Sequence, residues 1–431
     1  MGYTLAEKIL AAHAGGKSAR AGDVVVAAVD FAMIHDARAG NALKMIRKTG
    51  VESLPFARKT ALVLDHYSPP PNIEAANTHA DMRAFAEQWD TPIYDVGDGI
   101  CHQVLPEGGH LTCGDLVVGT DTHSTTYGAF NVFGTGVEGT DVAAVMLTGK
   151  LWFRVPESIR IELTGRLAPG VWAKDVTLHM LGRLGAEGAN YRALEYTGSG
   201  VAAMEIDDRM TLSNHAAELG AKAAILEADA KTLAWLKAHG AQTPRPVTAD
   251  ADAVYADRIT IDASALPPQV ARRHEIDDVV GVPEVAGQKI HAALIGTCTN
   301  GRLDDIRQAA AILKGHKIAR GVRMIVTPAS RQIYLQAARE GLIETLTAAG
   351  ASFEAAGCGT CVNITGHYIS GDDQVVISSA NRNFKGRLGN AKSEIWIGSS
   401  ATVAASALTG RITDPREVVG GLWRPETGKA A

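Results

Sequence analysis

The feature that most constrains the fold of this chain is a series of short, continuous apolar runs. Each run is followed by a polar or glycine-rich turn and then by a helical pattern. The runs cover residues 24–29, 60–64, 116–119, 292–296, 323–327 and 375–379. Strands that are apolar on both faces must be covered on both faces, which is typical of parallel strands joined by helices. The sequence therefore predicts an α/β protein with mostly parallel sheets, in which polar residues after the strands form the ligand-binding edge.

The length of the chain, 431 residues, allows more than one hydrophobic core. The stretch from Ala241 to Gln288 is rich in proline and aspartate, and a weaker break falls near Pro156. We therefore predict three α/β domains, over residues 1–155, 156–285 and 286–431.

Charge and composition exclude several classes of partner. The net charge is −5 and no dense lysine or arginine run occurs, which argues against a nucleic-acid or membrane-surface partner. The first residues predict an amphipathic helix, with Leu5, Ile9 and Leu10 on one side, and not a signal peptide. No apolar run is long enough to span a bilayer. The 5 cysteines are an odd number without a secretory signal, so we expect a cytoplasmic protein without a disulfide framework.

A C-x-x-C motif stands in 357-GCGTCVN-363, with Cys358 and Cys361 on either side of Gly-Thr. A thioredoxin-type redox pair lacks its small-domain context here. A zinc site normally takes further Cys or His ligands, and His367 is the only nearby candidate. Alone, the motif leaves a cluster, a zinc site and structural cysteines open.

Cys298 favours the cluster among these three alternatives. It lies in 294-LIGTCTNGR-302, where a strand leads into a turn before a helix that begins near Leu303, a position that favours a thiolate. Three thiolates from two such turns could hold an iron–sulfur cluster, and one iron would then stay open as a Lewis acid. The other two cysteines, Cys101 and Cys113, are interpreted as small buried hydrophobic residues.

Histidines stand close to carboxylates in four segments of the first third of the chain. The segments are 35-HDARAG-40, 65-DHYSPP-70, 100-ICHQVLPE-107 and 121-DTHSTTYGAF-130. A carboxylate that is hydrogen-bonded to one imidazole nitrogen fixes the tautomer of the ring and tunes its pKa, as proton transfer requires.

Farther along, 378-SSANRNFKGRLG-389 places Arg382 and Arg387 around a glycine turn after a strand, which favours a carboxylate-binding site.

Taken together, these motifs resemble the iron–sulfur hydro-lyases of the aconitase superfamily. Within it, the chain is most similar to the stand-alone large subunits of the 3-isopropylmalate dehydratase and homoaconitase group. The resemblance runs nearly end to end and includes TLAEKILAAHAG, DHYSP, GICHQVLPE, GTDTHSTTYGAF, RMTLSNHAAELGAK, IGTCTNGRLDDIR, CGTC and SSANRNFKGR. The combination of TCTNGR, the C-x-x-C about sixty residues later and NRNFKGR is its most specific part.

The resemblance implies a fold and a set of site residues. The fold would be three domains around a central cleft holding a 4Fe-4S cluster, with one iron open to the substrate. Cluster ligands would be Cys298, Cys358 and Cys361. Catalytic pairs would be His66 with Asp65, His102 with Asp121, and His123 with Glu218. Substrate-binding positions would be His35, Asp36, Thr122, Asn214, Asn381, Arg382 and Arg387.

The chain departs from the family pattern at three places. Thr122 stands where the family usually has a serine that touches substrate, and VNITGHYI follows the C-x-x-C in place of a run of small residues. The sequence ends at residue 431 without the swivelling domain that carries the family's catalytic serine and a further arginine. A separate small subunit, and hence a heterodimer, is therefore expected.

The implied reaction is dehydration and rehydration of a small 2- or 3-hydroxy di- or tricarboxylate, of the 3-isopropylmalate type used in amino-acid biosynthesis. His66 with Asp65 would protonate the departing hydroxide, and a base on the small subunit would take the proton from carbon. A simple dehydratase of 2,3-dimethylmalate or citramalate, or a homoaconitase, is the alternative. Two other classes are an RNA-binding regulator in the cluster-free state, which the missing basic stripe disfavours, and a zinc hydrolase using the C-x-x-C and His367.

Overall fold

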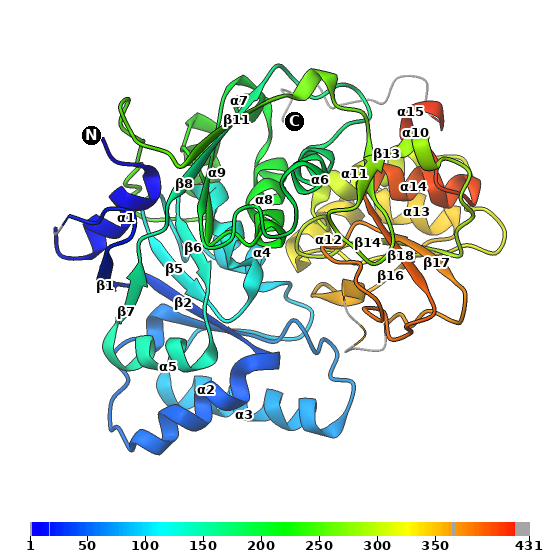
Figure 1. The fold of residues 1–431 in the computed structure, drawn as a ribbon. Coiled ribbons are helices and arrows are strands. Elements are labelled where there is room, and N and C mark those ends of the chain that lie inside the picture. The colour runs from blue at the N-terminus through cyan, green and yellow to red at the C-terminus, as the bar shows by residue number, and fades with distance from the viewer. Residues whose placement is uncertain (1, 17, 362, 364–366, 419–431) are drawn as a thin grey trace.

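The computed structural model describes residues 2–16, 18–361, 363 and 367–418. Its main elements are three mostly parallel β-sheets with the helices that pack on them (Figure 1). The first sheet has the order β4-β3-β2-β5-β6, and all of its neighbouring strands are parallel. Its strands are β2 (Phe31–His35), β3 (Thr60–Val63), β4 (Ile93–Tyr94), β5 (Leu116–Gly119) and β6 (Phe133–Gly136). This sheet confirms the parallel arrangement predicted from the continuous apolar runs.

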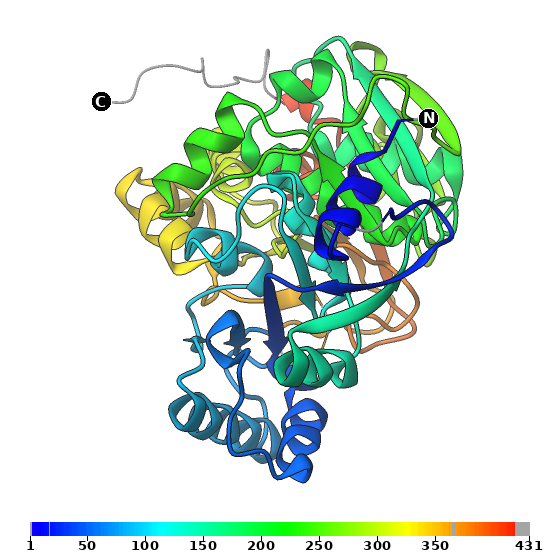
Figure 2. The same ribbon diagram turned by 90° about the vertical axis from the view of Figure 1, so that its left-hand side faces the viewer.

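Helices cover both faces of the first sheet. On the outer face, at the bottom of Figure 1, lie α2 (Asp36–Thr49), α3 (Ile73–Trp89) and α5 (Gly139–Thr148). Toward the centre of the molecule lie α4 (Cys101–Glu107) and the 3₁₀ helix η2 (Thr122–Phe130). The predicted N-terminal helix is α1 (Leu5–His13), which buries Leu5, Ile9 and Leu10 and contacts β5 and β6 of the first sheet (Figure 2).

The second sheet has the order β10-β9-β8-β11 and is also parallel throughout. Its strands are β8 (Ser158–Thr164), β9 (Ala193–Thr197), β10 (Ala223–Leu226) and β11 (Asp257–Asp262). Its helices are α6 (Ala173–Leu184), α7 (Ser199–Ala203), α8 (Ile206–His215), the 3₁₀ helix η3 (Ala216–Leu219) and α9 (Ala230–Ala238). Helix α8 packs against η2, so this unit directly adjoins the first.

The third sheet has the order β13-β12-β18-β17-β14-β15-β16. It is parallel from β18 to β16, and β12 is antiparallel to both of its neighbours. Its strands are β12 (Gln269–Ala271), β13 (Val279–Gly281), β14 (Ala292–Ile295), β15 (Arg323–Val326), β16 (Ser352–Phe353), β17 (Val375–Ser378) and β18 (Glu394–Gly398). Its helices are α10 (Val282–Val285), α11 (Leu303–Leu313), α12 (Arg331–Arg339), α13 (Leu342–Ala349), α14 (Ser400–Thr409) and α15 (Pro415–Val418).

One predicted strand does not belong to a parallel sheet. The run at residue 24 forms β1 (Val24–Ala28), which pairs antiparallel with β7 (Lys150–Arg154) in a two-stranded ribbon. Its burial alternates, and Val24 and Val26 are 67% and 61% exposed. The prediction of a strand covered on both faces is wrong here, because β1 leads directly into β2 without a crossover helix that could cover its outer face.

The predicted domain boundaries stay a prediction. The first two sheets lie within residues 31–136 and 158–262, but β12 and β13 precede residue 285 and pair in the third sheet.

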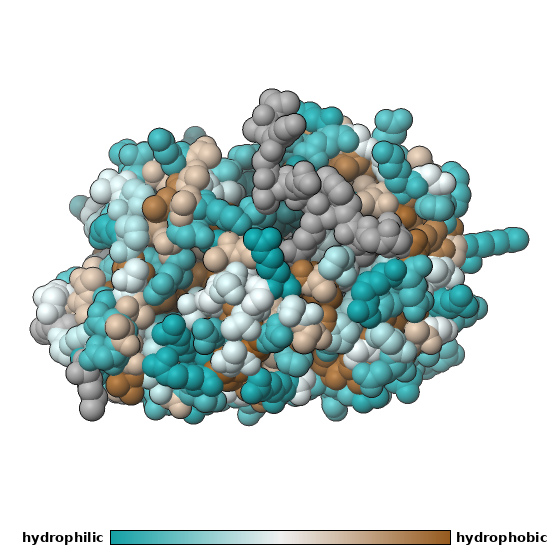
Figure 3. Space-filling view, turned by 90° about the horizontal axis from the view of Figure 1, so that it is seen from above, coloured by the Kyte–Doolittle hydropathy of each residue, from teal (hydrophilic) through white to brown (hydrophobic). Residues whose placement is uncertain are grey.

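No helix of the described residues is long and apolar enough to cross a membrane. The face seen from above in Figure 3 is mostly hydrophilic, and its hydrophobic residues are scattered in small areas.

Candidate active site

The carboxyl ends of β2, β3 and β5 meet those of β14 and β17 around a cavity of about 280 Å³. This is the edge at which parallel sheets bind ligands. Of the predicted site residues, the following line the cavity: His35, His66, His102, Asp121, Thr122, His123, Cys298, Cys358, Cys361, Arg382 and Arg387. The remaining ones do not line it, namely Asp36, Asp65, Asn214, Glu218 and Asn381.

The cavity holds the three cysteines of the predicted cluster site. Cys298 follows β14, whereas Cys358 precedes the short 3₁₀ turn Gly359–Cys361 and Cys361 ends it, and all three are buried free thiols. Nη2 of Arg387 lies 3.1 Å from the sulfur of Cys361, and Nε donates to its carbonyl oxygen at 2.8 Å. A hydrogen bond from Cys358, together with the charge of Arg387, holds the pKa of Cys361 well below its usual range despite burial. A thiolate is the form that binds metal.

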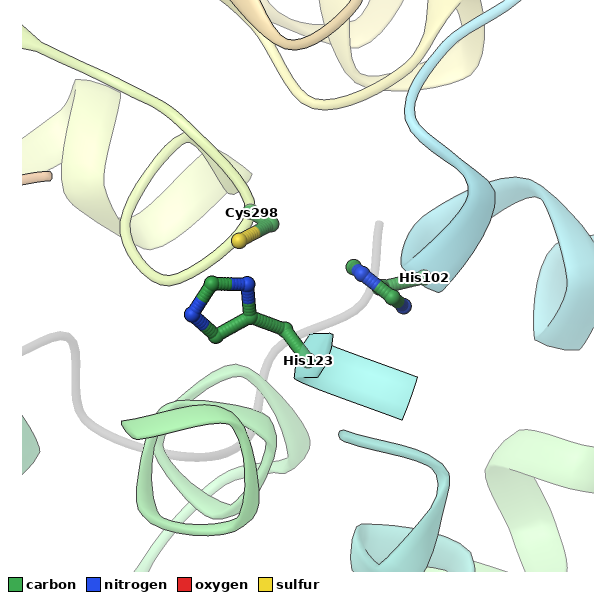
Figure 4. A group of neighbouring side chains, drawn as sticks. All are labelled: His102, His123 and Cys298. Carbon is green, nitrogen blue, oxygen red and sulfur yellow. The ribbon is translucent and has the colours of Figure 1, made fainter. Parts of the chain in front are cut away.

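His123 links Cys298 to the acid–base groups of the site. The nearest ligand atoms of His102, His123 and Cys298 all lie within 4.8 Å of one another, although they come from α4, η2 and the turn after β14 (Figure 4). Nε2 of His123 lies 2.8 Å from Oε1 of Glu218. Burial opposes protonation, but Cys298, Asp121 and Glu218 together raise the pKa of His123 well above its ordinary value. His123 is therefore held as a cation.

Asp121 is the hub of this network. Its Oδ1 lies 2.8 Å from Nε2 of His102 and 3.2 Å from Nδ1 of His123, and its Oδ2 lies 3.2 Å from Nε2 of His66. Although burial opposes ionisation, these three imidazoles hold the pKa of Asp121 well below its usual range. One carboxylate thus orients three histidines that face the cavity.

His66 lies between two carboxylates, those of Asp65 and Asp121. Its Nδ1 lies 2.8 Å from Oδ1 of Asp65, which is itself buried and accepts the backbone N–H of Cys101 at 2.8 Å. Burial favours the neutral ring, but Asp65 and Asp121 outweigh it and raise the pKa of His66 well above its ordinary value. The ring of His35 stacks on His66 with centroids 4.0 Å apart, and burial, with the nearby charge of His66, lowers the pKa of His35 to about 4. One imidazole of the stacked pair is therefore protonated and the other neutral.

Glu218 lies behind the cavity wall and holds two cavity residues at once. Besides its contact with His123, its two carboxylate oxygens accept from Nε of Arg382 at 3.0 and 2.8 Å. The hydrogen bond with His123 and the charges of His123 and Arg382 outweigh burial and lower the pKa of Glu218 to about 2. His123 is separated from Glu218 by 95 residues in the sequence, so only the fold brings them together.

The asparagines form a buried chain that ends at a cysteine. Nδ2 of Asn381 donates to Oδ1 of Asn214 at 2.7 Å, and the thiol of Cys298 lies 3.3 Å from Oδ1 of Asn381. Asn214 in turn donates to Oγ1 of Thr126 at 2.9 Å. The two asparagines therefore contact each other, and Asn381 also contacts Cys298. Neither asparagine lines the cavity.

The carboxylate of Asp36 contacts groups of the chain itself through both of its oxygens. One carboxylate oxygen accepts the backbone N–H of His66 at 3.1 Å, and the other accepts that of Tyr67 at 2.9 Å and lies 2.9 Å from Nε2 of His79. Asp36 therefore fixes the turn that carries His66, and its expected contact with substrate stays a prediction.

The sequence motifs missed several lining residues, which are Ala37, Arg38, Tyr67, Ile100 and Thr120. Arg38 stands out because it is an exposed cation on the first turn of α2. Its side chain forms no ion pair or hydrogen bond within the described part of the chain, whereas Arg382 and Arg387 are both anchored. The signal that could have found it is its position in 35-HDARAG-40, three residues after the strand-end His35.

A larger cavity, of about 720 Å³, lies on the other side of α4. His102 lines the first cavity, whereas Gln103 and Glu107 of the same helix line the second. Between them the buried side chain of Arg302 donates to Oε1 of Gln103 at 3.2 Å and to the carbonyl oxygen of Cys298 at 2.7 Å. Arg302 thus fixes the cysteine turn from behind.

His367 is engaged away from the cysteines. Its Nδ1 lies 2.7 Å from Oε1 of Glu354 and its Nε2 lies 3.0 Å from the carbonyl oxygen of Ser68. Both ring nitrogens are thus occupied, which removes the support for a zinc site formed with the C-x-x-C. Of the departure noted after Cys361, at residues 362–369, residues 362 and 364–366 lie outside the described residues.

Comparison with known proteins identifies the family of this chain. The model of the aconitase family (aconitate hydratase) matches residues 7–410. The large subunit 1 of 3-isopropylmalate dehydratase from Methanopyrus kandleri is 46% identical over 418 residues, covering 96% of this chain and 99% of that protein. The corresponding large subunit 1 from Thermotoga maritima is 44% identical over 423 residues, covering 97% and 100%.

Among solved structures, the holo-form of aconitase X from Thermococcus kodakaraensis matches with a TM-score of 0.50. It is 13% identical and the match covers 88% of this chain and 90% of that one, so it supports the fold alone. The family match and the relatives agree over nearly the whole chain. This chain belongs to the aconitase family.

Proposed function

We propose that this chain is the large, cluster-binding subunit of an iron–sulfur hydro-lyase that isomerises a hydroxy dicarboxylate of the 3-isopropylmalate type. The observation that carries the proposal is the convergence of three buried cysteines, three histidine–carboxylate pairs and two anchored arginines on one cavity of about 280 Å³. The names of the relatives agree with this assignment.

The cysteines suit a 4Fe-4S cluster with three protein ligands. Cys298, Cys358 and Cys361 all line the cavity, and Arg387 favours the thiolate of Cys361. A cluster bound there would supply an open iron as a Lewis acid for the substrate hydroxyl. The neighbouring Asn381 and Arg302 would hold the turn that carries Cys298.

Residues of the chain itself would bind the substrate carboxylate and supply the proton. Arg382 and Arg387 present guanidinium groups to a substrate carboxylate, while Glu218 and the backbone of Cys361 fix their orientation. His66 is kept protonated by Asp65 and Asp121, so it can donate a proton to the departing hydroxyl. Asp65 stays behind it and stabilises the imidazolium.

The chain would work with a separate small subunit. The relatives are named large subunits, and the reaction needs a base that takes the proton from carbon. We assign that base and the cover of the cavity to the partner, in a heterodimer in the cytoplasm.

Arg38 favours a second substrate class for the same site. It adds a third guanidinium to the cavity and is not neutralised by another described residue. An uncompensated cation beside a bound ligand favours an additional anionic group on that ligand. A hydroxy tricarboxylate, as a homoaconitase uses, is therefore the second candidate.

The test combines the purified chain with its small subunit after reconstitution with iron and sulfide. Hydroxy acids with an isopropyl group, with two methyl groups and with a third carboxylate are compared by the ultraviolet absorbance of the alkene product. The proposal expects turnover of at least one of them only when both subunits and iron are present. Equal turnover by the cluster-free pair would overturn it.

A further inference from the structure

Lys174, in the first turn of α6, is a buried cation that the scheme above does not use. Its exposed fraction is 0%. Within the described part of the chain the ammonium group forms no ion pair, and its closest partners are the carbonyl oxygens of Ala380 at 2.8 Å and Ser379 at 3.2 Å. Oγ1 of Thr299 lies 3.5 Å away. Burying a cation among neutral partners costs free energy unless a negative charge lies nearby.

The titratable residue beside Lys174 does not provide that charge. Nε2 of His215 lies 3.5 Å from Nζ of Lys174. Burial, together with the charge of Lys174, holds the pKa of His215 well below its ordinary value, so the ring is neutral. Burial also lowers the pKa of Lys174 to about 7, against the attraction of Cys298 and Glu218. One of the acidic groups that attract the ammonium group, Cys298, is thus a cysteine of the candidate cluster site.

Lys174 contacts two turns of the candidate cluster site, the one that follows β14 and the one that follows β17. Thr299 directly follows Cys298, and Ser379 and Ala380 lead into the turn of Asn381 and Arg382. The ammonium group belongs to α6, which contacts α8 and the strands β12, β13 and β18, and its partners follow β14 and β17 of the third sheet. It therefore lies where the cysteine turn and the arginine turn meet.

We propose that Lys174 is the built-in countercation of the cluster bound by Cys298, Cys358 and Cys361. It is a positioning residue, which acts through its charge and through the backbone of both turns. The proposal rests on the proposed function, because the cluster with its three thiolates adds negative charge, beyond that of Glu218, to an ammonium group without an ion pair among the described residues. Charges interact strongly in a buried, low-dielectric site, so direct contact is not needed.

This assignment predicts effects of opposite sign in the two states of the protein. Without a cluster, the charge of Lys174 is a cost, so a neutral side chain should leave the chain equally stable or make it more stable. With a cluster, the same change removes a favourable interaction and should weaken cluster binding. A residue that served packing alone would weaken both states.

The experiment uses Lys174→Met and Lys174→Gln, because methionine is close to lysine in length and removes the charge, while glutamine removes the charge and keeps a hydrogen-bond donor. Lys222→Met is the matched control: this partly buried lysine also donates to a backbone carbonyl, that of Gly136 at 3.1 Å, and does not line the cavity. Thermal unfolding is measured on the cluster-free chains. Release of iron to a chelator is measured on the reconstituted chains by loss of visible absorbance.

Both Lys174 variants are expected to release iron about tenfold faster than wild type, the usual scale for a residue that supports metal ligands indirectly. Lys222→Met is expected to release iron at the wild-type rate. The cluster-free Lys174 variants should unfold at or above the wild-type temperature. Release from Lys174→Gln at the wild-type rate, or cluster-free variants that unfold earlier or fail to fold, would overturn the proposal. A wild-type chain that takes up no iron or sulfide would instead refute the proposed function, and this proposal with it.

Discussion

Nε2 of His123 lies 2.8 Å from Oε1 of Glu218, and the two residues come from units built on different sheets. Glu218 also accepts two bonds from Arg382, so one buried carboxylate orients a histidine and an arginine that face the same cavity. Through Glu218 the second unit of the chain thus orients two residues of the site.

Replacing Glu218 by glutamine should weaken both of its partners. We expect Glu218→Gln to lower kcat/KM about 10- to 100-fold, because His123 and Arg382 lose the charge that orients them. Steady-state kinetics of the reconstituted pair of subunits checks this. Glu344→Gln, an exposed glutamate on α13, is the control and should behave as wild type. Wild-type kinetics for both variants would contradict the role.

The same carboxylate predicts a pH dependence of stability. Its pKa in the folded chain is about 2, below its ordinary value of 4.5, so folding favours the charged form. Its contribution to the free energy of unfolding is fully present above pH 4.5 and is lost as pH falls through about 2. Glu218→Gln should destabilise the cluster-free chain by up to about 3 kcal/mol at pH 7 and by clearly less at pH 3. Urea unfolding at the two pH values measures this difference, and an equal loss at both would contradict it.

His66 should be the proton donor. We expect His66→Gln to lower kcat by a factor of about 10² to 10⁴ with little change in KM, because glutamine keeps a polar group but cannot supply the proton. For wild type, kcat should fall as pH rises through the raised pKa of His66, since the imidazolium is then lost. A variant at the exposed His316 serves as the control. A wild-type rate in His66→Gln would assign the proton to another group.

Arg38 should separate the two candidate substrate classes. If the substrate carries a third carboxylate, Arg38→Gln should raise KM for the tricarboxylate about tenfold or more and leave KM for an alkyl-substituted dicarboxylate unchanged. Competition kinetics with the two substrates measures the ratio. Arg320→Gln, an exposed arginine outside the cavity, is the control. Unchanged KM values for both substrates would leave no role in specificity for Arg38.

The parallel sheets could be predicted because their strands are apolar on both faces, and this holds for β3, β5, β14, β15 and β17. The same pattern failed for β1, where Val24 and Val26 are exposed, because valines look alike in sequence whether they are covered or not. The histidine–carboxylate pair at Asp65 and His66 is visible as neighbours in the sequence.

Other parts of the site follow only from the three-dimensional arrangement or from family resemblance. Glu218 lies in an ordinary helical stretch, and no local pattern reports that it meets His123. Lys174 and Arg302 resemble surface cations in sequence, yet both are buried and hold the turn after β14. Asp36 reads as a strand-end carboxylate, whereas its oxygens are occupied by the turn of His66 and Tyr67. Long-range pairing of this kind depends on how three sheets pack, which short motifs do not encode.

The central claim is that Cys298, Cys358 and Cys361 together hold a catalytic iron–sulfur cluster. The most direct measurement is the iron and sulfide content of the reconstituted chain, taken together with its dehydratase rate beside the small subunit. The account predicts about four iron and four sulfide per chain, and loss of both the cluster and the activity in Cys298→Ser, with circular dichroism unchanged. Full activity in a Cys298→Ser chain, or in a wild-type chain that binds no iron, would contradict it.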